Sequence, residues 1–157
     1  EITAGRYRYF DISDSKLQSL NANNVISFRS TNVRVHYKKS QLTGLQLPEG
    51  NFKDVVFENC RINLSNFRNS QFERCVFKDC DLTDADFSMS RLTLVQFDSC
   101  QLENTEFSHC VNKRVEFVNC SLGSIKGING LRGATISNQN LIELAPLLAL
   151  ALDLTVN

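Results

Sequence analysis

The stretch SNFRNSQFERCVFKDCDLTDADF, residues 65–87, repeats with a period of five residues. Phenylalanine or leucine recurs at positions 67, 72, 77, 82 and 87, and each is preceded two residues earlier by Ser, Cys or Ala. A period of five fits neither an α-helix nor a β-strand, whose side chains recur at about 3.6 and 2 residues. The stretch therefore predicts a chain that turns a corner every five residues and points two side chains per repeat inward.

The same frame extends from Leu42 to Leu122, where sixteen of seventeen central positions are Phe, Leu or Ile. A second period of twenty lies within it, since every fourth centre is phenylalanine at positions 57, 77, 97 and 117. Four repeats then form one square coil, and like side chains stack in successive coils. At a strand spacing of about 4.8 Å per coil, six to seven coils would form a rod about 30 Å long.

The runs CDLTDADF (80–87) and CQLENTEF (100–107) resemble the pentapeptide-repeat proteins, whose consensus A(D/N)LXX places a small residue two before a central Leu or Phe. The resemblance implies an all-β solenoid, a right-handed quadrilateral β-helix, to which we add a C-terminal α-helical cap. We expect the β-helix over residues 1–136, with a tight repeat over 40–122 and an irregular segment over 23–36. Residues 137–157 are expected to form the C-terminal helical cap and dimerisation segment.

The irregular segment is predicted from two polar residues in the frame. Ser27 and Asn32 occupy central positions, whereas Phe28 and Val33 fit a frame shifted by one residue. A shift of one residue within a strand is typical of a bulge. We therefore expect a bulge or a short loop between residues 23 and 36.

Asn112 is the second interruption, in the column of Phe52, Phe72 and Leu92. An inward amide needs hydrogen-bond partners, because an unpaired buried polar group costs about 1–3 kcal/mol. Val111 could point inward in its place. A local distortion near the end of the rod is the favoured interpretation, and a functional kink is the alternative.

The C-terminal segment is predicted to be helical. Ser137 is a good N-cap for a helix over 138–152, and Pro146 should kink or restart that helix. Leucines cover nearly every helical face, whereas capping a rod needs one apolar stripe. The surplus predicts a homodimer, as the family resemblance also implies, with a candidate interface of Leu141, Leu144, Leu147, Leu148, Leu150 and Leu152.

All six cysteines, at positions 60, 75, 80, 100, 110 and 120, share one register of five. A zinc site needs four sulfurs about 2.3 Å from one point, which thiols strung along a column cannot provide. Disulfides between adjacent coils would leave the Cβ atoms wider apart than the usual 3.8 Å or so. We favour free buried thiols acting as small hydrophobes, with no metal and no cofactor, in a reducing and hence cytoplasmic compartment.

Catalysis is not expected. The sequence contains no Gly-rich phosphate loop and no nucleophile with an evident base, and a rod with a solid core offers no concave pocket. The 17 basic and 17 acidic residues cancel, so direct nucleic-acid binding is not expected either. No apolar run reaches the roughly 18 residues that span a bilayer, so a membrane is not an expected partner.

The charges are nevertheless uneven: residues 1–50 carry a net charge of +3 and residues 51–125 carry −3. Lys53/Glu73 and Asp54/Arg74 are predicted to be neutral cross-coil pairs. Within 79–106 seven acids accompany Arg91 alone, and they form a candidate partner-binding surface: Asp79, Asp81, Asp84, Asp86, Asp98, Glu103 and Glu106.

Two interpretations of this acidic set remain open. It is either the solvated face of a scaffold protein with no topoisomerase role, or a protein-binding surface. The family includes quinolone-resistance and gyrase-interacting members that imitate DNA in size, shape and charge. The resemblance therefore implies a non-enzymatic interaction module that modulates a type II topoisomerase, DNA gyrase or topoisomerase IV.

Overall fold

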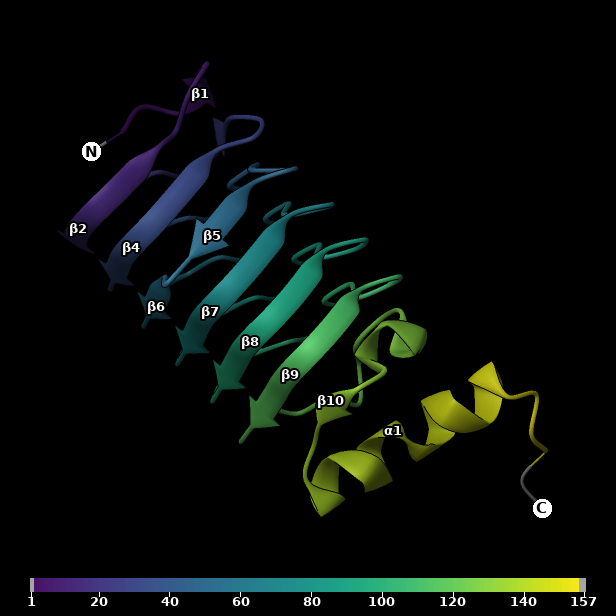
Figure 1. The fold of residues 1–157 in the computed structure, drawn as a ribbon. Coiled ribbons are helices and arrows are strands. Elements are labelled where there is room, and N and C mark those ends of the chain that lie inside the picture. The colour runs from purple at the N-terminus through teal and green to yellow at the C-terminus, as the bar shows by residue number, and fades with distance from the viewer. Residues whose placement is uncertain (1, 156–157) are drawn as a thin grey trace.

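The computed structural model describes residues 2–155, so residues 1, 156 and 157 of the two predicted segments lie outside the described part. The chain winds into a right-handed quadrilateral β-helix of about seven coils, followed by the helix α1 (Asn138–Ala151). Figure 1 shows the strands of successive coils side by side and α1 beyond the last coil. The predicted fold class is confirmed.

The strands form parallel ladders along the rod. The long ones are β2 (Ile12–Gln18), β4 (Thr31–Lys38), β7 (Gln71–Lys78), β8 (Arg91–Asp98) and β9 (Val111–Val118), and one coil is divided into β5 (Asn51–Lys53) and β6 (Val56–Glu58). Short strands lie at the two ends: β1 (Gly5–Arg6), β3 (Val25–Ile26) and β10 (Ala134–Thr135). Phe77 pairs with Phe57 on one side and Phe97 on the other, so the register is twenty residues, as predicted.

Each coil has four walls, which we name by their central inward residues. Wall A is centred on 52, 72, 92 and 112, wall B on 57, 77, 97 and 117, wall C on 62, 82, 102 and 122, and wall D on 67, 87 and 107. The long strands run through walls A and B, and isolated bridges link walls C and D of neighbouring coils. Walls A and C are opposite each other because their centres are ten residues apart in a coil of twenty.

A left-handed residue stands at every corner. From Asp14 to Asn119 every fifth residue has a positive φ, between 49° and 60° in all but Gly44. Most side chains other than Gly, Asn and Asp are strained in this region, where the chain bends sharply. The pentapeptide period is therefore the period of these bends.

Stacked aromatic rings fill the interior. Along wall B the rings of residues 37, 57, 77, 97 and 117 stack with centroids 4.9–5.0 Å apart. Along wall D, Phe87 lies 5.3 Å from Phe67 and 5.6 Å from Phe107. Rings from the two walls meet edge to face, as Phe77 and Phe87 do at 5.7 Å, a favourable geometry for aromatic pairs. The phenylalanines of the frame thus form one continuous core.

Where the residue two before a centre is Cys or Ser, its side chain can donate to a carbonyl of the preceding coil. Cys80 Sγ donates to the carbonyl of Phe57 at 3.3 Å, and Ser90 Oγ donates to that of Phe67 at 2.8 Å. All six cysteines are free and buried, so the predicted packing role is confirmed. Burial raises the pKa of the Cys75 and Cys110 thiols to about 12. These thiols remain protonated, pack as small hydrophobic side chains in the walls, and act as weak hydrogen-bond donors.

The predicted bulge over 23–36 is absent, because the register of twenty residues is kept throughout: β3 pairs in register with β1, Ile26 is bridged to Gln46, and β4 pairs in register from Thr31 onward. Asn32 pairs with Ile12 and Phe52 and is fully buried, and Phe28 is 54 % exposed. The Tyr37 hydroxyl donates to Asn32 Oδ1 at 2.5 Å. A hydrogen-bonded amide therefore takes an inward position without shifting the frame.

The predicted distortion at Asn112 is also wrong. Asn112 stays opposite Leu92 in an unbroken β9, and Val111 is 59 % exposed. Asn112 Nδ2 donates to the carbonyl of Gly130 at 2.6 Å. The last coil thus supplies a partner for the amide nitrogen, whereas the buried Asn112 Oδ1 has none within residues 2–155.

The helix α1 closes the C-terminal end of the rod. The Ser137 hydroxyl accepts the Asn140 N–H, which confirms the predicted N-cap, but the helix continues through Pro146 without the predicted restart. Asn140 Nδ2 donates to the Cys120 carbonyl at 2.7 Å, and the Glu143 carboxylate accepts the Leu122 N–H at 2.9 Å. That backbone hydrogen bond lowers the pKa of Glu143.

The N-terminal end has no such cover within residues 2–155. Its inward residues Ile2, Tyr7, Ile12 and Leu17 are only partly buried. No helix in the described part of the chain is long and apolar enough to cross a membrane.

The close approach of two coils at Gly130 gives a test of the fold. An alanine Cβ there would lie 1.6 Å from the Phe107 carbonyl oxygen. We expect Gly130→Ala to lower the free energy of unfolding by about 1–3 kcal/mol or more, because backbone on both sides has to shift. Thermal and urea unfolding measure the loss. Gly123→Ala is the control, since its Cβ would meet Glu143 Cβ at an ordinary 3.7 Å. Equal losses in both variants would contradict the packing described.

Candidate functional site

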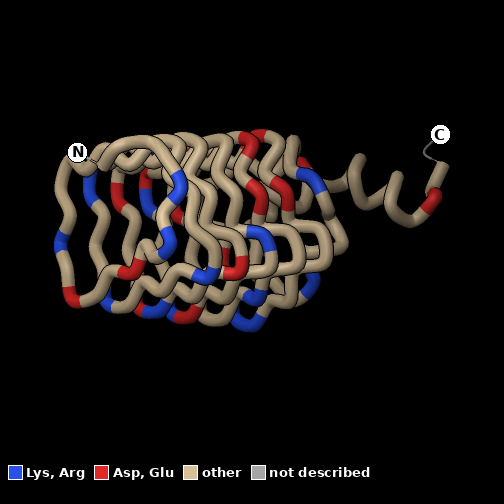
Figure 2. Tube along the Cα trace, turned by 90° about the horizontal axis from the view of Figure 1, so that it is seen from above, with Lys and Arg blue, Asp and Glu red and all other residues tan. Residues whose placement is uncertain are grey.

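The structure gathers the seven predicted acidic residues on one side of the rod, which we call the acidic surface. Four lie on one coil within 79–86 and three on the next within 98–106. They occupy wall C and the ends of walls B and D that adjoin it, and Asp86 is bridged to Glu106 directly along the rod. Figure 2 shows acidic segments gathered on one side of the C-terminal half of the rod. Arg91, which lies within the same stretch of sequence, stands on wall A at the opposite side.

Local hydrogen bonds position several of these carboxylates. Asp81 accepts the N–H of Thr83 at 3.0 Å, and Asp86 accepts that of Ser88 at 2.7 Å. Glu106 does the same for the N–H two residues on, at 2.8 Å. Asn66 makes the equivalent bond at 2.9 Å in an earlier coil. These positions need a side-chain oxygen for the turn, which an amide provides as well as a carboxylate.

The acidic surface keeps its negative charge. Within residues 2–155 none of the seven carboxylates forms an ion pair with Lys or Arg. Asp79 and Asp84 lie exposed at left-handed corners. Asp86 stacks above Glu106, and like charges in facing positions repel. Three of the seven face a cation of the neighbouring coil without pairing with it, since Asp81 is bridged to Arg61, Glu106 is bridged to Lys126, and Asp98 stands opposite Lys78. The surface is therefore anionic, with cations at its margins.

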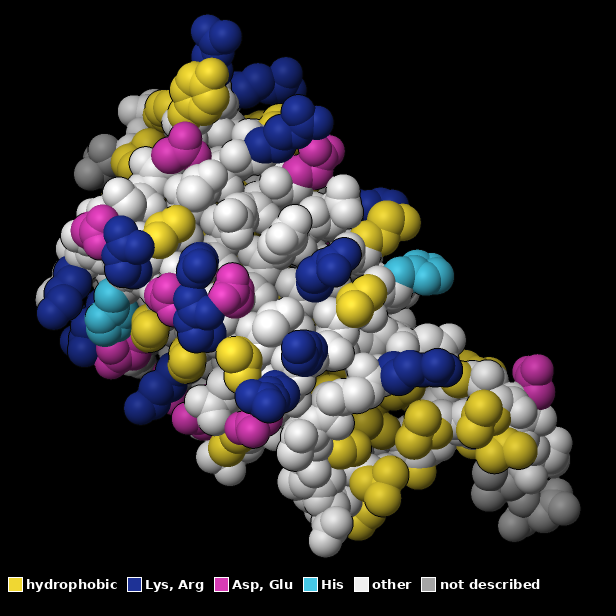
Figure 3. Space-filling view, in the orientation of Figure 1, with side chains coloured by type: hydrophobic (Ala, Val, Ile, Leu, Met, Phe, Trp, Pro, Cys, Tyr) yellow, Lys and Arg dark blue, Asp and Glu magenta, His cyan; other side chains and the backbone are white. Residues whose placement is uncertain are grey.

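Charges nearer the N-terminus are compensated. Arg74 pairs with Asp54 at 2.6 Å, and Lys53 lies 3.9 Å from Glu73, so both predicted cross-coil pairs are confirmed. In Figure 3 dark-blue and magenta side chains meet in this region. The Arg74 guanidinium lowers the pKa of Asp54 by hydrogen bonding to it. The carboxylates of Asp54 and Glu73 are thus paired with cations, unlike those of the acidic surface.

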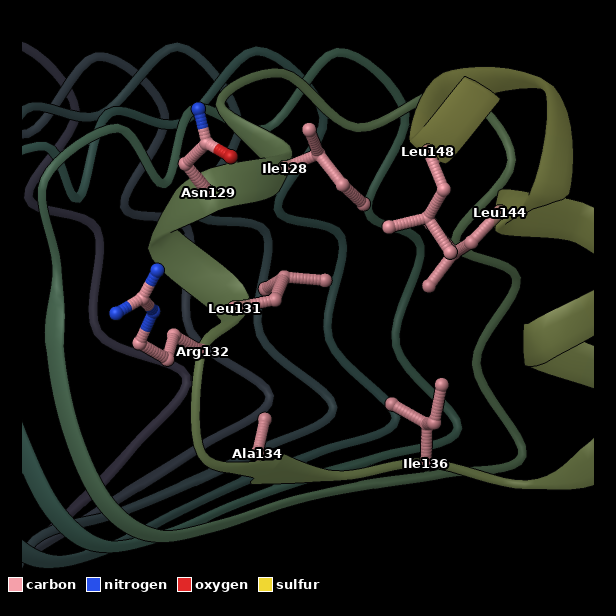
Figure 4. Close-up of a pocket in the computed structure, with 8 residues that line it drawn as sticks. All are labelled: Ile128, Asn129, Leu131, Arg132, Ala134, Ile136, Leu144 and Leu148. Atoms are coloured by element: carbon pink, nitrogen blue, oxygen red, sulfur yellow. The ribbon is translucent and has the colours of Figure 1, made fainter. Parts of the chain in front are cut away.

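The expectation that the rod has no concave pocket is wrong. A hollow of about 310 Å³ lies between the last coil and α1, because the helix leaves the end of the rod partly uncovered. Its lining is mainly aliphatic, as Figure 4 shows: Ile128, Asn129, Leu131, Arg132, Ala134, Ile136, Leu144 and Leu148. None of these side chains is an acid–base group for neutral pH. In the sequence this region is marked by the glycines at 123, 127, 130 and 133, which do not indicate a hollow.

A second hollow, of about 320 Å³, lies on the acidic surface beside Asp79 and Asp81. The buried thiols of Cys60 and Cys80 form part of its wall. No group of three or more His, Cys, Asp or Glu in the described part of the chain is arranged to hold a metal ion.

The six predicted interface leucines separate into two groups. Leu141, Leu150 and Leu152 are 53 %, 75 % and 66 % exposed. Leu144 is 2 % exposed against the rod of its own chain, and Leu147 and Leu148 pack partly against the same core. Leu144 is thus part of the cap, because the helix turns this side chain towards the last coil, and it is not free for a partner.

Residues 50–126 match the family model described as a pentapeptide repeat region. The chain belongs to the pentapeptide-repeat family. The match spans the coils that carry the aromatic core and the acidic surface.

Solved structures of other pentapeptide-repeat proteins are similar to this chain. A protein of the Arabidopsis thaliana thylakoid lumen is 12 % identical over 60 % of this chain and 66 % of its own length, just under two thirds, with a TM-score of 0.43. A trypsin-treated variant of QnrB1, a plasmid-mediated fluoroquinolone resistance protein, is 14 % identical over 94 % of this chain and 99 % of its own, with a TM-score of 0.37. Rfr23 of the cyanobacterium Cyanothece 51142 is 17 % identical over 70 % of this chain and 86 % of its own, with a TM-score of 0.31. No curated protein matches the chain.

The local hydrogen bonds allow the charge of the acidic surface to be removed without loss of the fold. We expect the triple variant Asp79→Asn, Asp84→Asn, Asp86→Asn to melt at or above the wild-type temperature. Asparagine suits left-handed corners and replaces the turn oxygen, and repulsion falls. Asp86→Ala should instead cost about 1 kcal/mol, because the Ser88 N–H loses its acceptor. Thermal unfolding compares them, and a triple variant less stable than Asp86→Ala would contradict this account.

Proposed function

We propose that this protein is a non-enzymatic interaction module whose acidic surface occupies the DNA-binding groove of a type II topoisomerase, DNA gyrase or topoisomerase IV. The observation that carries the proposal is the set of seven carboxylates, unpaired with Lys or Arg in the described chain, on one side of two adjacent coils. Family membership supports it at the level of the class, since other pentapeptide-repeat proteins act through interactions of the rod.

The charge density supports imitation of DNA. Two coils at about 4.8 Å each occupy about 10 Å of the rod axis. B-DNA carries about one negative charge per 1.7 Å, or about six in that length. The acidic surface presents seven carboxylates. Over this short length the rod matches a duplex in charge per unit length.

The match is confined to these coils. Residues 1–50 carry a net positive charge and the whole chain is neutral. A basic groove would therefore engage the C-terminal half of the rod, on the side of wall C. Complementary charges would raise mainly the association rate and the specificity of this contact, because they steer the encounter of the two proteins.

A structural scaffold with no topoisomerase role is the second candidate. It is favoured by the turn bonds of Asp81, Asp86 and Glu106, since an acid at these positions has a structural task that Asn66 performs elsewhere. On this account the rod positions partners by its shape. The charge of the acidic surface would then be dispensable.

DNA supercoiling by gyrase distinguishes the two candidates. We expect the protein to inhibit supercoiling or to protect gyrase from a quinolone. The triple variant Asp79→Asn, Asp84→Asn, Asp86→Asn should be weaker by about tenfold or more in half-maximal concentration, because the lost carboxylates face the partner's cations.

The matched control is Asp11→Asn, Glu49→Gln, Asp153→Asn, which removes three charges away from the acidic surface. It should behave as the wild type. Absence of any effect of the wild-type protein on either topoisomerase would refute the proposal and leave the scaffold role. An equal loss in both triple variants would show that net charge, and not this surface, is recognised.

The protein is further proposed to form a homodimer through the exposed side of α1. Leu141, Leu150 and Leu152 are too exposed to contribute to the cap of their own rod. A two-fold pairing of the helices would bury these side chains in both copies. The partners proposed are thus proteins, with no direct nucleic acid and no membrane, and the buried free thiols favour the cytoplasm as the compartment.

Sedimentation tests the dimer. We expect wild-type protein to sediment as a dimer at micromolar concentration and Leu150→Ser, Leu152→Ser to sediment as a folded monomer, since these side chains have no role in the core. Leu144→Ser is the contrasting variant and should destabilise the cap by about 2–4 kcal/mol. A wild-type monomer would contradict the dimer whatever the variants do.

A further inference from the structure

A group of unpaired cations lies on wall A near the C-terminal end of the rod. Arg91, Lys113, Arg114 and Arg132 are exposed, and within residues 2–155 none of them forms an ion pair. Earlier coils of the same wall are different, since Arg34 and Arg74 each pair with the aspartate of the preceding coil. Figure 2 shows isolated basic segments along the edge of the rod near this end. The positive charge here is uncompensated by the wall itself.

The register explains why these cations lack partners. Arg91 stands between Gln71 and Val111, and Lys113 stands beside Thr93. The acids of wall A, such as Glu73, lie in coils nearer the N-terminus. Glu116 is the neighbouring carboxylate on wall B, and it is exposed without an ion pair to Arg114. The positive charge is therefore available to a partner.

Apolar side chains are exposed among the cations. Val111 is 59 % exposed, and Leu94 is 40 % exposed at a left-handed corner with φ of 55°. Leu94 occupies the same corner column as Asp54, Arg74 and Arg114, which are charged. Leu94 and Arg114 also line a shallow hollow of about 360 Å³ together with Gln96 and Glu116, so one carboxylate lies at the border of the cations. Figure 3 shows yellow side chains between dark-blue ones over β8 and β9.

We propose that this basic surface, formed by Arg91, Lys113, Arg114 and Arg132 with Leu94 and Val111, binds an acidic segment of a protein partner that also carries apolar side chains. Carboxylates of the segment pair with the free cations, and an aliphatic side chain covers Leu94 and Val111. Burial of exposed apolar area adds to the electrostatic attraction. The proposal is independent of the proposed function, which uses the opposite side of the rod.

A nucleic acid fits these observations less well. A duplex is bound by long arrays of cations that neutralise many phosphates, whereas this surface offers four and the chain has no net positive charge. Exposed aliphatic side chains favour a protein segment, which has matching apolar groups. The test includes a duplex so that the two classes are compared directly.

Binding of a fluorescent synthetic peptide of repeated Glu-Leu-Asp-Ser units, measured by anisotropy at low salt, tests the proposal. We expect Arg91→Glu, Lys113→Glu to weaken binding by about tenfold or more, because two attractions become repulsions. Val111→Ser should weaken it by about threefold through lost apolar contact. Circular dichroism confirms that each variant is folded.

Two matched controls accompany these variants. Lys16→Glu, Arg68→Glu makes the same change of net charge on walls B and D, and Phe28→Ser removes an exposed apolar side chain from wall D. Both should bind within twofold of the wild type. A peptide with serine in place of leucine should bind more weakly to the wild type.

Four outcomes of the binding experiment would overturn the proposal. They are no binding of the peptide, equal losses in the test and control charge variants, tighter binding of a DNA duplex than of the peptide, and equal binding of the leucine and serine peptides. Salt-sensitive self-association in sedimentation that Arg91→Glu, Lys113→Glu abolishes would make a second copy the occupant, and this would also contradict it.

Discussion

The vertical stacking of like side chains is the constraint on which the rest of the rod depends. Coils stack at the spacing of β-strands, about 4.8 Å, and the aromatic centroids of wall B stand 4.9–5.0 Å apart. Ring stacking and backbone pairing therefore require the same separation. A residue that moved out of its column would lose the ring stacking and the backbone pairing together. Charged residues are therefore confined to outward positions. The same stacking brings residues twenty apart into contact, such as Asp54 and Arg74.

The periods of five and twenty predict the fold and its register because they describe repeated contacts. They fail at Ser27, Asn32 and Asn112, where composition indicates a break and the structure shows none. Asn32 and Asn112 lie at the two ends of the aromatic run on wall A, and each finds a hydrogen-bond partner. The partner of Asn32 Oδ1 is Tyr37 of the same coil, whereas Asn112 Nδ2 uses the carbonyl of Gly130 in the next coil. The pattern of five does not reveal which atoms will bond an inward amide.

The acidic set could be predicted as a group, because seven acids fall within 28 residues. Their arrangement in space follows only from the four walls. The twenty-residue frame places Arg91 on the opposite side of the rod, so this arginine counts in the net charge of residues 79–106 although it does not lie on the acidic surface. The same frame separates the basic surface from the acidic surface, whereas their residues alternate along the sequence. Turn hydrogen bonds, such as that of Asp86, are visible only in the structure. Asp81, Asp86 and Glu106 therefore each hold a turn by a hydrogen bond as well as contributing a negative charge.

The two ends of the rod differ, and the difference has a dynamic consequence. In a solenoid each coil is held only by its neighbours, so unfolding proceeds from a free end. The first coil leaves Ile2, Tyr7, Ile12 and Leu17 partly uncovered, whereas Asn140 and Leu144 secure the last one. We therefore expect the amide protons of the first coil to exchange faster than those of the coil next to α1. The charged walls of the C-terminal half then lie in the part of the molecule that opens last.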